Sequence, residues 1–339
     1  MAAREQMLKT EIRKYLDYAL PESPIPELGD SKKGKVRDIY FHEDKVIMLT
    51  NDRVSAFDFI LPNLIPFKGM VLNRISEWAF EATKDIIPNA LWKAGADPSC
   101  VIQKKMKNLQ VECIVRGYMW GSMAGAYERG ERTFCGLELK DDLIRFEKFP
   151  EPIFTPTTKA EMGDHDENMT MGEVAALVGE EMAQKAKETA LKLYARGNEL
   201  MRKNGMILID TKYEFGLDEN GVLHVIDEVN TPDSSRMCEI TEWESKYPKI
   251  EAEMKTGQYK TVSELLKAKP ELKIKEYSKQ YVRDALLDMG FNPAKDLKAP
   301  KLTEEQVVEC AYRYINICEK ITGEEFVFPN INVPIRERV

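Results

Sequence analysis

The sequence lacks the patterns that mark a zinc site, a disulfide-rich domain or a membrane span. Its six cysteines include no C-x-x-C pair and its three histidines include no H-E-x-x-H, so we expect neither a zinc site nor a disulfide framework. No stretch approaches about 18 consecutive uncharged apolar residues, and the N-terminus mixes charges at helical spacing. We therefore expect no membrane span and no signal segment, and a location in the reducing cytoplasm.

Charge of one sign is not in large excess either. The chain of 339 residues has 49 Lys plus Arg against 57 Asp plus Glu, a formal net charge of −8. No overall field favours nucleic acid or an anionic membrane, so neither is expected as a partner, and an anionic ligand needs a local site. With 43% hydrophobic and 31% charged residues, and few Gly or Pro, the composition is that of a folded globular protein. The length favours two domains, or one large domain with an appendage.

Apolar periodicity predicts a mixed α+β chain. Residues 4–20 suit a short amphipathic helix, and from residue 35 short β-rich runs, with one helix over 72–84, predict a mostly antiparallel sheet. Helices are then predicted from Ser122 to Arg129, from a capping box at Thr170 and Glu173, and up to Asn204, with a break at Gly179. Two more are predicted over 278–287 and 303–321. We predict a smaller β-rich lobe of residues 1–110 and a larger lobe of residues 111–339, with a C-terminal helical extension over about residues 260–339.

The segment from residue 206 to residue 229 predicts a β-hairpin. Asp210, Lys212 and Glu214 alternate along its first strand, so they share one face. If Asn220-Gly221 forms a two-residue turn, Glu214 lies opposite Asp227, and the two carboxylates destabilise the pair unless a cation or proton lies between them. Oxygen ligands without thiolate or imidazole suit Mg²⁺, or alternatively Mn²⁺, with a nucleotide phosphate completing the coordination shell.

Two alternatives remain open for this hairpin. Its charged face fits an ordinary solvated surface on which Lys212 balances its acidic neighbours. A four-residue loop over 218–221 would instead place Glu214 opposite Val225, and the metal argument would then fail.

Two segments suit the binding of phosphate groups. Gly34 lies among Lys32, Lys33, Lys35 and Arg37, and a glycine turn with basic flanks can cradle phosphates; an exposed turn is the alternative. In VRGYMWGSMAG (115–125), Arg116 ends a predicted strand and Ser122 begins a helix, so a guanidinium, a hydroxyl and backbone N–H groups can converge on one anion. An ordinary helix cap is the alternative there.

Two loops carry further ionisable groups. TKAEMGDHDEN (158–168) contains Lys159, His165 and Asp166, and a loop so rich in charge is either solvated or functional. Residues 227–237 follow the second hairpin strand directly, so a turn there can return Arg236 to the same pocket, while a plain Pro-Asp turn is the alternative.

Six motifs together carry a family resemblance. They are GKVRDIY (34–40), NDRVSAFD (51–58), VECIVRGYMWGS (111–122), TKAEMGDHDEN (158–168), DTKYEFG (210–216) and DEVNTPDSSR (227–236). In this order they resemble the SAICAR synthetase family, the phosphoribosylaminoimidazole-succinocarboxamide synthases, and the helices from YSKQYVRD onward resemble those of its longer members. The resemblance implies a kinase-like or ATP-grasp-like α+β fold of two lobes, in which the smaller antiparallel lobe covers the nucleotide.

The resemblance also implies a reaction. ATP, carboxyaminoimidazole ribonucleotide (CAIR) and L-aspartate would give SAICAR, ADP and phosphate in purine biosynthesis. A carboxylate is a poor acyl donor, so transfer of the γ-phosphoryl group would make an acyl phosphate that the amine can displace. Two other hypotheses stay open: a small-molecule kinase that stops at the phosphorylated product, and a catalytically silent nucleotide-binding regulator.

Site roles follow from the resemblance motif by motif. Gly34, Lys35, Val36 and Arg37 would line ATP, Lys104 and Lys105 would approach its adenine, and Glu214 and Asp227 would hold Mg²⁺. Arg116, Ser122 and Arg236 would bind the ribonucleotide phosphate, and Lys159, Asp166, Asp210 and Lys212 would surround the reacting groups. Asp210 is the expected general base because it shares a strand face with Lys212. The motifs assign no individual role to Ser55, Asp58 or His165, and no oligomeric state.

Overall fold

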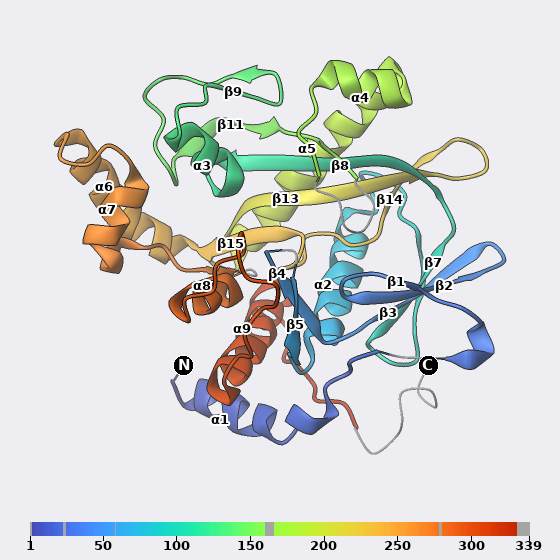
Figure 1. The fold of residues 1–339 in the computed structure, drawn as a ribbon. Coiled ribbons are helices and arrows are strands. Elements are labelled where there is room, and N and C mark those ends of the chain that lie inside the picture. Colours follow the sequence, from blue (N-terminus) through green and yellow to red (C-terminus); the bar gives the residue numbers. More distant parts are fainter. Residues whose placement is uncertain (1, 23–24, 58, 160–165, 278–279, 331–339) are drawn as a thin grey trace.

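Three of the predicted β-rich runs, β2, β3 and β7, lie in an antiparallel five-stranded sheet, while the runs at 57–62 and 109–118 belong to other sheets. The computed structural model describes residues 2–22, 25–57, 59–159, 166–277 and 280–330, and the strand order of this sheet is β1-β2-β3-β7-β6 (Figure 1). The strand bounds are β1 (Lys32–Lys33), β2 (Arg37–His42), β3 (Lys45–Thr50), β6 (Leu91–Ala94) and β7 (Cys100–Lys104). Alternation of side chains puts one face of this sheet against the core and turns the other toward a cleft.

A larger sheet of seven strands follows in the chain. Its main order is β11-β8-β13-β15-β16, with β12 paired to β8 and β14 paired to β13. The bounds are β8 (Lys107–Tyr118), β11 (Lys148–Phe154), β12 (Thr157–Thr158), β13 (Met206–Leu217), β14 (Leu223–Ile226), β15 (Ser235–Glu239) and β16 (Glu276–Tyr277). Two small hairpins, β4 (Arg53–Ala56) with β5 (Phe59–Leu64) and β9 (Thr133–Phe134) with β10 (Leu137–Glu138), complete the described strands. The long strands β8 and β13 run side by side (Figure 1) and carry Glu112, Arg116, Asp210, Lys212 and Glu214.

The helices lie on the core faces of these sheets and at the C-terminal end. They are α1 (Ala2–Arg13), α2 (Lys68–Thr83), α3 (Gly121–Glu128), α4 (Met171–Val178), α5 (Glu180–Lys203), α6 (Ile240–Lys255), α7 (Val262–Ala268), α8 (Gln280–Asp288) and α9 (Glu304–Thr322), with short 3₁₀ turns at Leu16–Tyr18, Pro26–Leu28 and Pro270–Leu272. The capping boxes at Thr170 and Thr303 are both formed, and α5 packs its apolar face on β13 and β8. The sequence did not predict α6 and α7, because apolar residues are sparse there.

The two ends of the chain pack together. Helix α9 contacts α2 and α1, and one apolar core contains Leu8, Ile75, Tyr194 and Ile315 from distant parts of the sequence. The division into lobes at residue 110 stays a prediction, because this core takes residues from both sides of that position, while the five-stranded sheet has a small cluster of its own with Tyr40, Leu49 and Cys100. All six cysteines are free thiols. Among the described helices, none has the length and apolar character that a membrane crossing requires.

Candidate active site

A cleft of about 700 Å³ opens between the five-stranded sheet and the edge of the larger sheet. Its walls combine a cationic turn, an apolar surface and two carboxylates. The lining residues are Lys32, Gly34, Lys35, Val36, Arg37, Ile39, Phe41, Val46, Met48, Gln103, Lys104, Met106, Asn108, Gln110, Lys159, Glu214, Ile226 and Asp227. The structure thus brings together eight of the predicted site residues: the Gly34–Arg37 turn, Lys104, Lys159, Glu214 and Asp227.

The glycine turn is held in shape by backbone and side-chain bonds. Gly34 donates its N–H to the carbonyl of Arg37 at 2.7 Å. Arg53, from the NDRVSAFD motif, donates to the carbonyls of Gly34 (3.0 Å) and Lys35 (3.3 Å) and pairs with Asp38 at 3.0 Å. Arg53 therefore fixes the carbonyls of Gly34 and Lys35, and the turn lines the cleft from Gly34 to Arg37.

An apolar surface faces this turn across the cleft. It is formed by Ile39, Val46 and Met48 on one side, with Met106 and Ile226 on the other. Phe41, which is 52% exposed, lines the same cleft. Lys104 lines the cleft, while Lys105 lies with its Nζ 5.9 Å from the centroid of the Phe41 ring. The surface suits a flat aromatic ring system such as a nucleobase.

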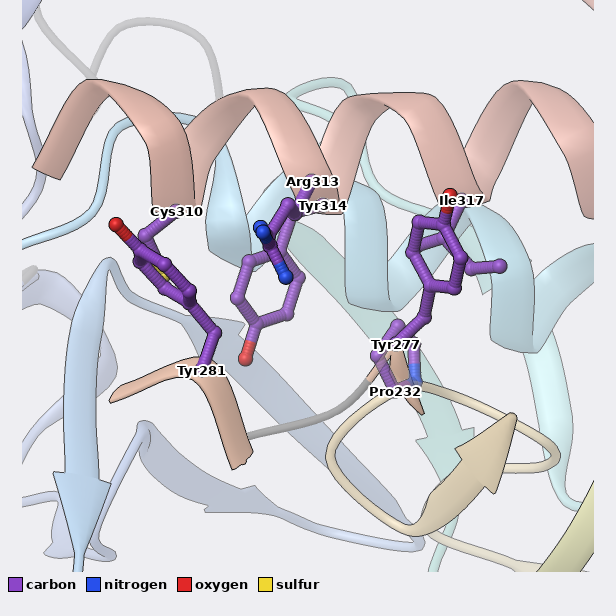
Figure 2. Close-up of a pocket in the computed structure, with 7 residues that line it drawn as sticks. All are labelled: Pro232, Tyr277, Tyr281, Cys310, Arg313, Tyr314 and Ile317. Atoms are coloured by element: carbon purple, nitrogen blue, oxygen red, sulfur yellow. The ribbon is translucent and has the colours of Figure 1, made fainter. Parts of the chain in front are cut away.

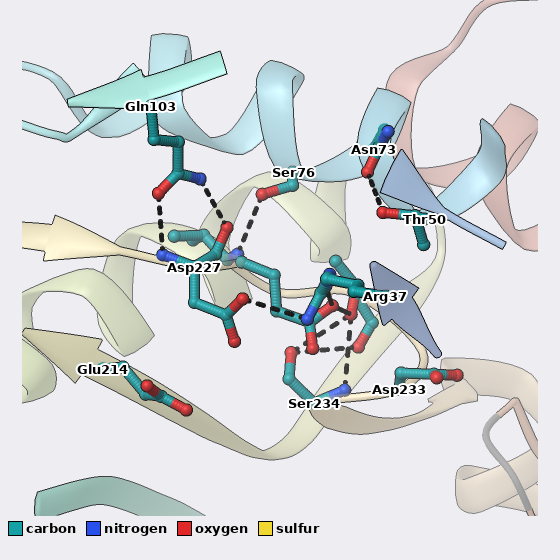
Figure 3. Close-up of polar contacts among 12 residues, drawn as sticks. Arg37, Thr50, Asn73, Ser76, Gln103, Glu214, Asp227, Asp233 and Ser234 are labelled. Atoms are coloured by element: carbon teal, nitrogen blue, oxygen red, sulfur yellow. Dashed lines mark hydrogen bonds and ion pairs between the residues drawn. The ribbon is translucent and has the colours of Figure 1, made fainter. Parts of the chain in front are cut away.

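Asp227 is held from both sheets at once. Its backbone has a positive φ of 64°, and the Gln103 amide satisfies its backbone N–H (3.1 Å) and carbonyl (2.8 Å). Its Oδ1 accepts from Arg37 at 3.0 Å, and Arg37 also pairs with Glu228 at 2.7 Å (Figure 3). Burial alone would lower the pKa of Arg37, but the carboxylates of Asp227 and Glu228 outweigh it and raise that pKa. Arg37 is thus a permanent cation that ties the small sheet to the large one.

The predicted register of the hairpin is wrong. Glu214 pairs with Ile226 and Phe215 pairs with Val225, and residues 218–222 form the connection, so neither the two-residue turn nor the four-residue loop is present. Asp218 accounts for the difference, because its carboxylate accepts the N–H groups of Asn220 (2.9 Å) and Val222 (2.8 Å). Asp227 lies one residue beyond the end of β14. Its carboxylate enters the cleft through the positive φ, and not through strand pairing opposite Glu214.

Glu214 is surrounded by cationic and polar groups. It forms an ion pair with Lys159, accepts from Asn108 at 3.1 Å, and lies 3.6 Å from Lys212. Burial would raise the pKa of Glu214, but Lys212 and Lys159 outweigh burial and lower it. The side chain is therefore a carboxylate, and Figure 3 shows Glu214 and Asp227 in one view of the cleft.

Glu112 is a site residue that the motif reading did not single out. It pairs directly with Glu214 across β8 and β13, and its buried carboxylate contacts Lys212 and accepts from Thr157 at 3.2 Å. Burial raises the pKa of Glu112. Burial would lower the pKa of Lys212, yet Glu214 and Glu112 raise it, so Lys212 is a cation and not a base. The sequence signal that could have identified Glu112 was an acidic residue within the otherwise apolar start of the strand VECIVRGY.

Arg116 and Arg236 converge on Asp210, which lies farther along β13. The Oδ2 atom of Asp210 accepts from Arg116 at 3.1 Å and from Arg236 at 2.7 Å. Burial lowers the pKa of Arg116, and Asp210 raises the pKa of Arg236. The expectation that Asp210 and Lys212 act together loses its basis, because the Asp210 carboxylate contacts two guanidinium groups and Lys212 contacts Glu112 instead. Asp210 positions the arginines.

The N-terminus of α3 lies beside this arginine pair. The helix begins at Gly121 after Trp120, without a side-chain cap, so the predicted capping role of Ser122 is wrong; Ser122 is an exposed residue of the first turn. Gly121 has φ +60°, and a Cβ there would lie 2.7 Å from the guanidinium carbon of Arg236. Only glycine lets Arg236 approach the helix end so closely. Guanidinium groups and backbone N–H groups meet here, which is an anion site.

Four further residues of the motifs remain, and the structure describes two of them. Asp166 is exposed. Burial is the main reason that the pKa of Glu112 is raised, and the charge of Asp166 raises it further. Ser55 is buried in β4. Asp58 and His165 lie outside the described residues. No group of three or more His, Cys, Asp or Glu side chains suited to a metal occurs among the residues that the structure describes.

Comparison with known proteins agrees with this geometry. The family model described as SAICAR synthetase matches residues 30–255. The phosphoribosylaminoimidazole-succinocarboxamide synthase of Bacteroides fragilis is 42% identical over 299 residues, which is 87% of each chain. The synthase of the same name from Cytophaga hutchinsonii is 39% identical over 309 residues, covering 91% of this chain and 92% of that one. A solved structure of the SAICAR synthase of Saccharomyces cerevisiae, complexed with SAICAR, superposes with a TM-score of 0.75 at 29% identity, covering 91% of this chain and all of that one.

Proposed function

The chain belongs to the SAICAR synthetase family, and we propose that the cleft and the arginine pair are where it joins CAIR to L-aspartate at the expense of ATP. It is a carbon–nitrogen ligase of purine biosynthesis, and its products are SAICAR, ADP and phosphate. The observation that carries the site assignment is the meeting of the glycine turn, Lys159, Glu214 and Asp227 in one cleft.

ATP occupies the 700 Å³ cleft. The apolar surface with Phe41 takes the adenine ring, and the turn with Lys35 and Arg37 takes the phosphates. Lys104 and Lys159 add positive charge along the same cleft. Because Arg37 contacts Asp227 from the opposite sheet, the phosphates bind where the two sheets meet.

Mg²⁺ is part of this proposal, and the residues present fit it. Glu214 and Asp227 offer hard carboxylate oxygens in the nucleotide cleft, and two protein carboxylates with substrate phosphates are a common Mg²⁺ arrangement, with Mn²⁺ as a chemical substitute. When bound, the ion neutralises charge on the transferring phosphoryl group.

The ribonucleotide phosphate binds at the N-terminus of α3. Arg116 and Arg236 supply the guanidinium groups, Ser122 supplies a hydroxyl, and Asp210 holds both arginines in place. Asp210, beside the anion site, and Glu214, in the nucleotide cleft, lie on the same strand β13. The imidazole carboxylate of CAIR therefore lies between the anion site and the nucleotide phosphates. Lys212 lies between these two residues on the same strand.

The chemistry proceeds through an acyl phosphate. An oxygen of the CAIR carboxylate attacks the γ-phosphorus, and the bond to ADP breaks. The aspartate amine then attacks the activated carbonyl carbon, phosphate leaves, and the amine loses a proton. Lys212 and Lys159, both cations beside Glu214, stabilise the negative charge that develops on the transferring group.

The cellular setting belongs to the proposal as well. Six free cysteines are compatible with a reducing compartment, and we place the enzyme in the cytoplasm with ATP, CAIR and L-aspartate as its small-molecule partners.

Substrate omission tests the reaction. ADP release is measured with each of the three substrates left out in turn, and we expect release only when CAIR and L-aspartate are both present. Release at full rate without L-aspartate would reject ligation and favour a small-molecule kinase. Tight ATP binding without turnover in any combination would favour a nucleotide-binding regulator.

A further inference from the structure

The C-terminal segment, residues 304–328, contacts the loop that leads to Arg236. We call residues 231–236 the Arg236 loop. Its Asp233 carboxylate accepts from the Tyr314 hydroxyl of α9 at 2.7 Å and from the Lys68 ammonium of α2 at 2.7 Å. Tyr314 and Pro232 of the loop line one small pocket beside α9 (Figure 2). The family model matches residues 30–255, so Tyr314 reaches this loop from outside the matched region.

The Asp233 carboxylate is buried together with both of these partners. Its Oδ1 accepts from Tyr314 and its Oδ2 from Lys68, and the side chains of Lys68 and Asp233 are 0% and 3% exposed. A buried ion pair is weak support for stability, because the desolvation of two charges offsets their attraction. What such a pair contributes here is one fixed arrangement of the elements that carry it. Asp233 thus ties the Arg236 loop to α2 and α9.

The C-terminal segment also packs beside Lys68. The preceding residue, Phe67, has a positive φ of 67°, and its ring contacts those of Phe326 and Phe328 at centroid distances of 5.5 and 5.2 Å. The Nζ atom of Lys68 lies 5.5 Å from the centroid of the Tyr314 ring, at which distance an aromatic face attracts a cation. The segment therefore supplies one partner of the loop carboxylate and packs against the other.

The position of Asp233 bears directly on Arg236, which follows it by three residues. Between them, the Ser234 carbonyl accepts the backbone N–H of Lys212 at 3.0 Å, so β13 holds one side of the loop while Asp233 holds the other. Arg236 then donates to Asp210 at 2.7 Å. A loop fixed on two sides restricts where the Arg236 guanidinium can lie.

We propose that Tyr314 is a positioning residue for the ribonucleotide: its hydroxyl holds Asp233, and through the Arg236 loop it sets the guanidinium that binds the phosphate of CAIR. The inference rests on the proposed function, because it takes the phosphate to lie at Arg236. Tyr314 acts through the loop and is not a catalytic residue. Helix α9 thereby contributes to the affinity for one substrate in addition to its packing against α1 and α2.

The first test is Tyr314→Phe in the full-length protein. Phenylalanine keeps the ring beside Pro232 and removes only the hydroxyl, so the fold is retained. A hydrogen bond to a charged group corresponds to about a 10- to 100-fold change in an equilibrium constant. Because Lys68 still holds Asp233, we expect a smaller rise, about 5- to 10-fold, in the KM for CAIR. The kcat and the KM for ATP should stay within about twofold, since the hydroxyl contributes to ribonucleotide binding alone.

A double-mutant cycle with Arg236→Lys tests the route of the effect. Lysine keeps the positive charge but lacks the planar fork of arginine. If the hydroxyl acts through Arg236, adding Tyr314→Phe to Arg236→Lys should raise the KM for CAIR less than about twofold further. The full rise in both backgrounds would show that the two residues act independently and would overturn the proposal. An unchanged KM for CAIR in Tyr314→Phe would overturn it as well, and so would equal increases in the KM values for CAIR and ATP.

The matched control is Tyr312→Phe. Tyr312 lies on the same helix, and its hydroxyl bonds to the carboxylate of Glu5, which belongs to α1. We expect unchanged KM values for all three substrates. A rise in the KM for CAIR in this control similar to that in Tyr314→Phe would indicate a general effect of α9 and overturn the proposal. A KM for CAIR in Arg236→Lys equal to that of the unmodified enzyme would instead reject the phosphate site of the proposed function.

Discussion

Replacing Gly121 by alanine isolates the approach of Arg236 to the helix end. An added Cβ would lie 2.7 Å from Cζ and Nη1 of Arg236 and 2.9 Å from Nη2, so the guanidinium must move away. The move would weaken its 2.7 Å bond to Asp210 and take it away from the position that we propose for the ribonucleotide phosphate. A charge-assisted hydrogen bond contributes about 1.5 to 3 kcal/mol, and its loss corresponds to about a 10- to 100-fold increase in the KM for CAIR.

The assay varies CAIR and ATP separately while ADP release is followed at saturating L-aspartate. Gly121→Ala also strains the backbone, because its φ is +60° and the left-handed conformation costs an alanine about 1 to 2 kcal/mol. Gly257→Ala controls for this strain: Gly257 has φ +72° and no atom within 4 Å of an added Cβ. We expect both variants to lose similar stability and only Gly121→Ala to lose affinity for CAIR. A KM for CAIR in Gly121→Ala within twofold of that in Gly257→Ala would refute the reasoning.

Three further substitutions test the proposed metal ligand Asp227, the pH dependence due to Asp52, and the ion pair of Lys68 with Asp233. Asp227→Asn should raise the Mg²⁺ concentration for half-maximal activity at least about tenfold, because one anionic ligand becomes neutral; an unchanged Mg²⁺ titration would remove Asp227 from the ion. Burial raises the pKa of Asp52 from 3.8 to about 6, so the folded state binds this proton more tightly. The free energy of unfolding should therefore fall by up to about 3 kcal/mol between about pH 4 and pH 6. Urea unfolding should show no such contribution in Asp52→Asn, and an identical decline in both proteins would contradict the assignment. Lys68→Met leaves Asp233 without its fully buried cation and should cost about 3 to 5 kcal/mol in urea unfolding; a loss below 1 kcal/mol would mean that Tyr314 alone suffices.

A polar network joins the cleft to residues 231–234. Arg37 contacts Glu228 at 2.7 Å, Thr231 donates to the same carboxylate at 2.6 Å, and the hydroxyls of Thr231 and Ser234 lie 3.3 Å apart (Figure 3). At one end Arg37 lines the cleft of about 700 Å³, and at the other end Ser234 lines a cavity of about 100 Å³ beside Asp210.

The amino-acid sequence by itself determined the local features whose partners lie within a few residues. The capping boxes at Thr170 and Thr303 are satisfied three residues ahead, and the alternation of Asp210, Lys212 and Glu214 follows from the geometry of a single strand. The turn at Gly34 is likewise closed within a few residues, by the bond from its N–H to the Arg37 carbonyl. These features need no information about distant residues.

Only the tertiary structure decided which charges meet. Lys212 pairs with Glu112, one hundred positions away, and Arg37 with Asp227, 190 positions away, and no local pattern specifies such contacts. The hairpin register, by contrast, was decided inside its own loop. There the Asp218 carboxylate accepts from the Val222 N–H, and this bond competed with the Asn-Gly turn. The energy of a buried charge depends on the groups that replace its water, and long-range packing alone brings those groups together.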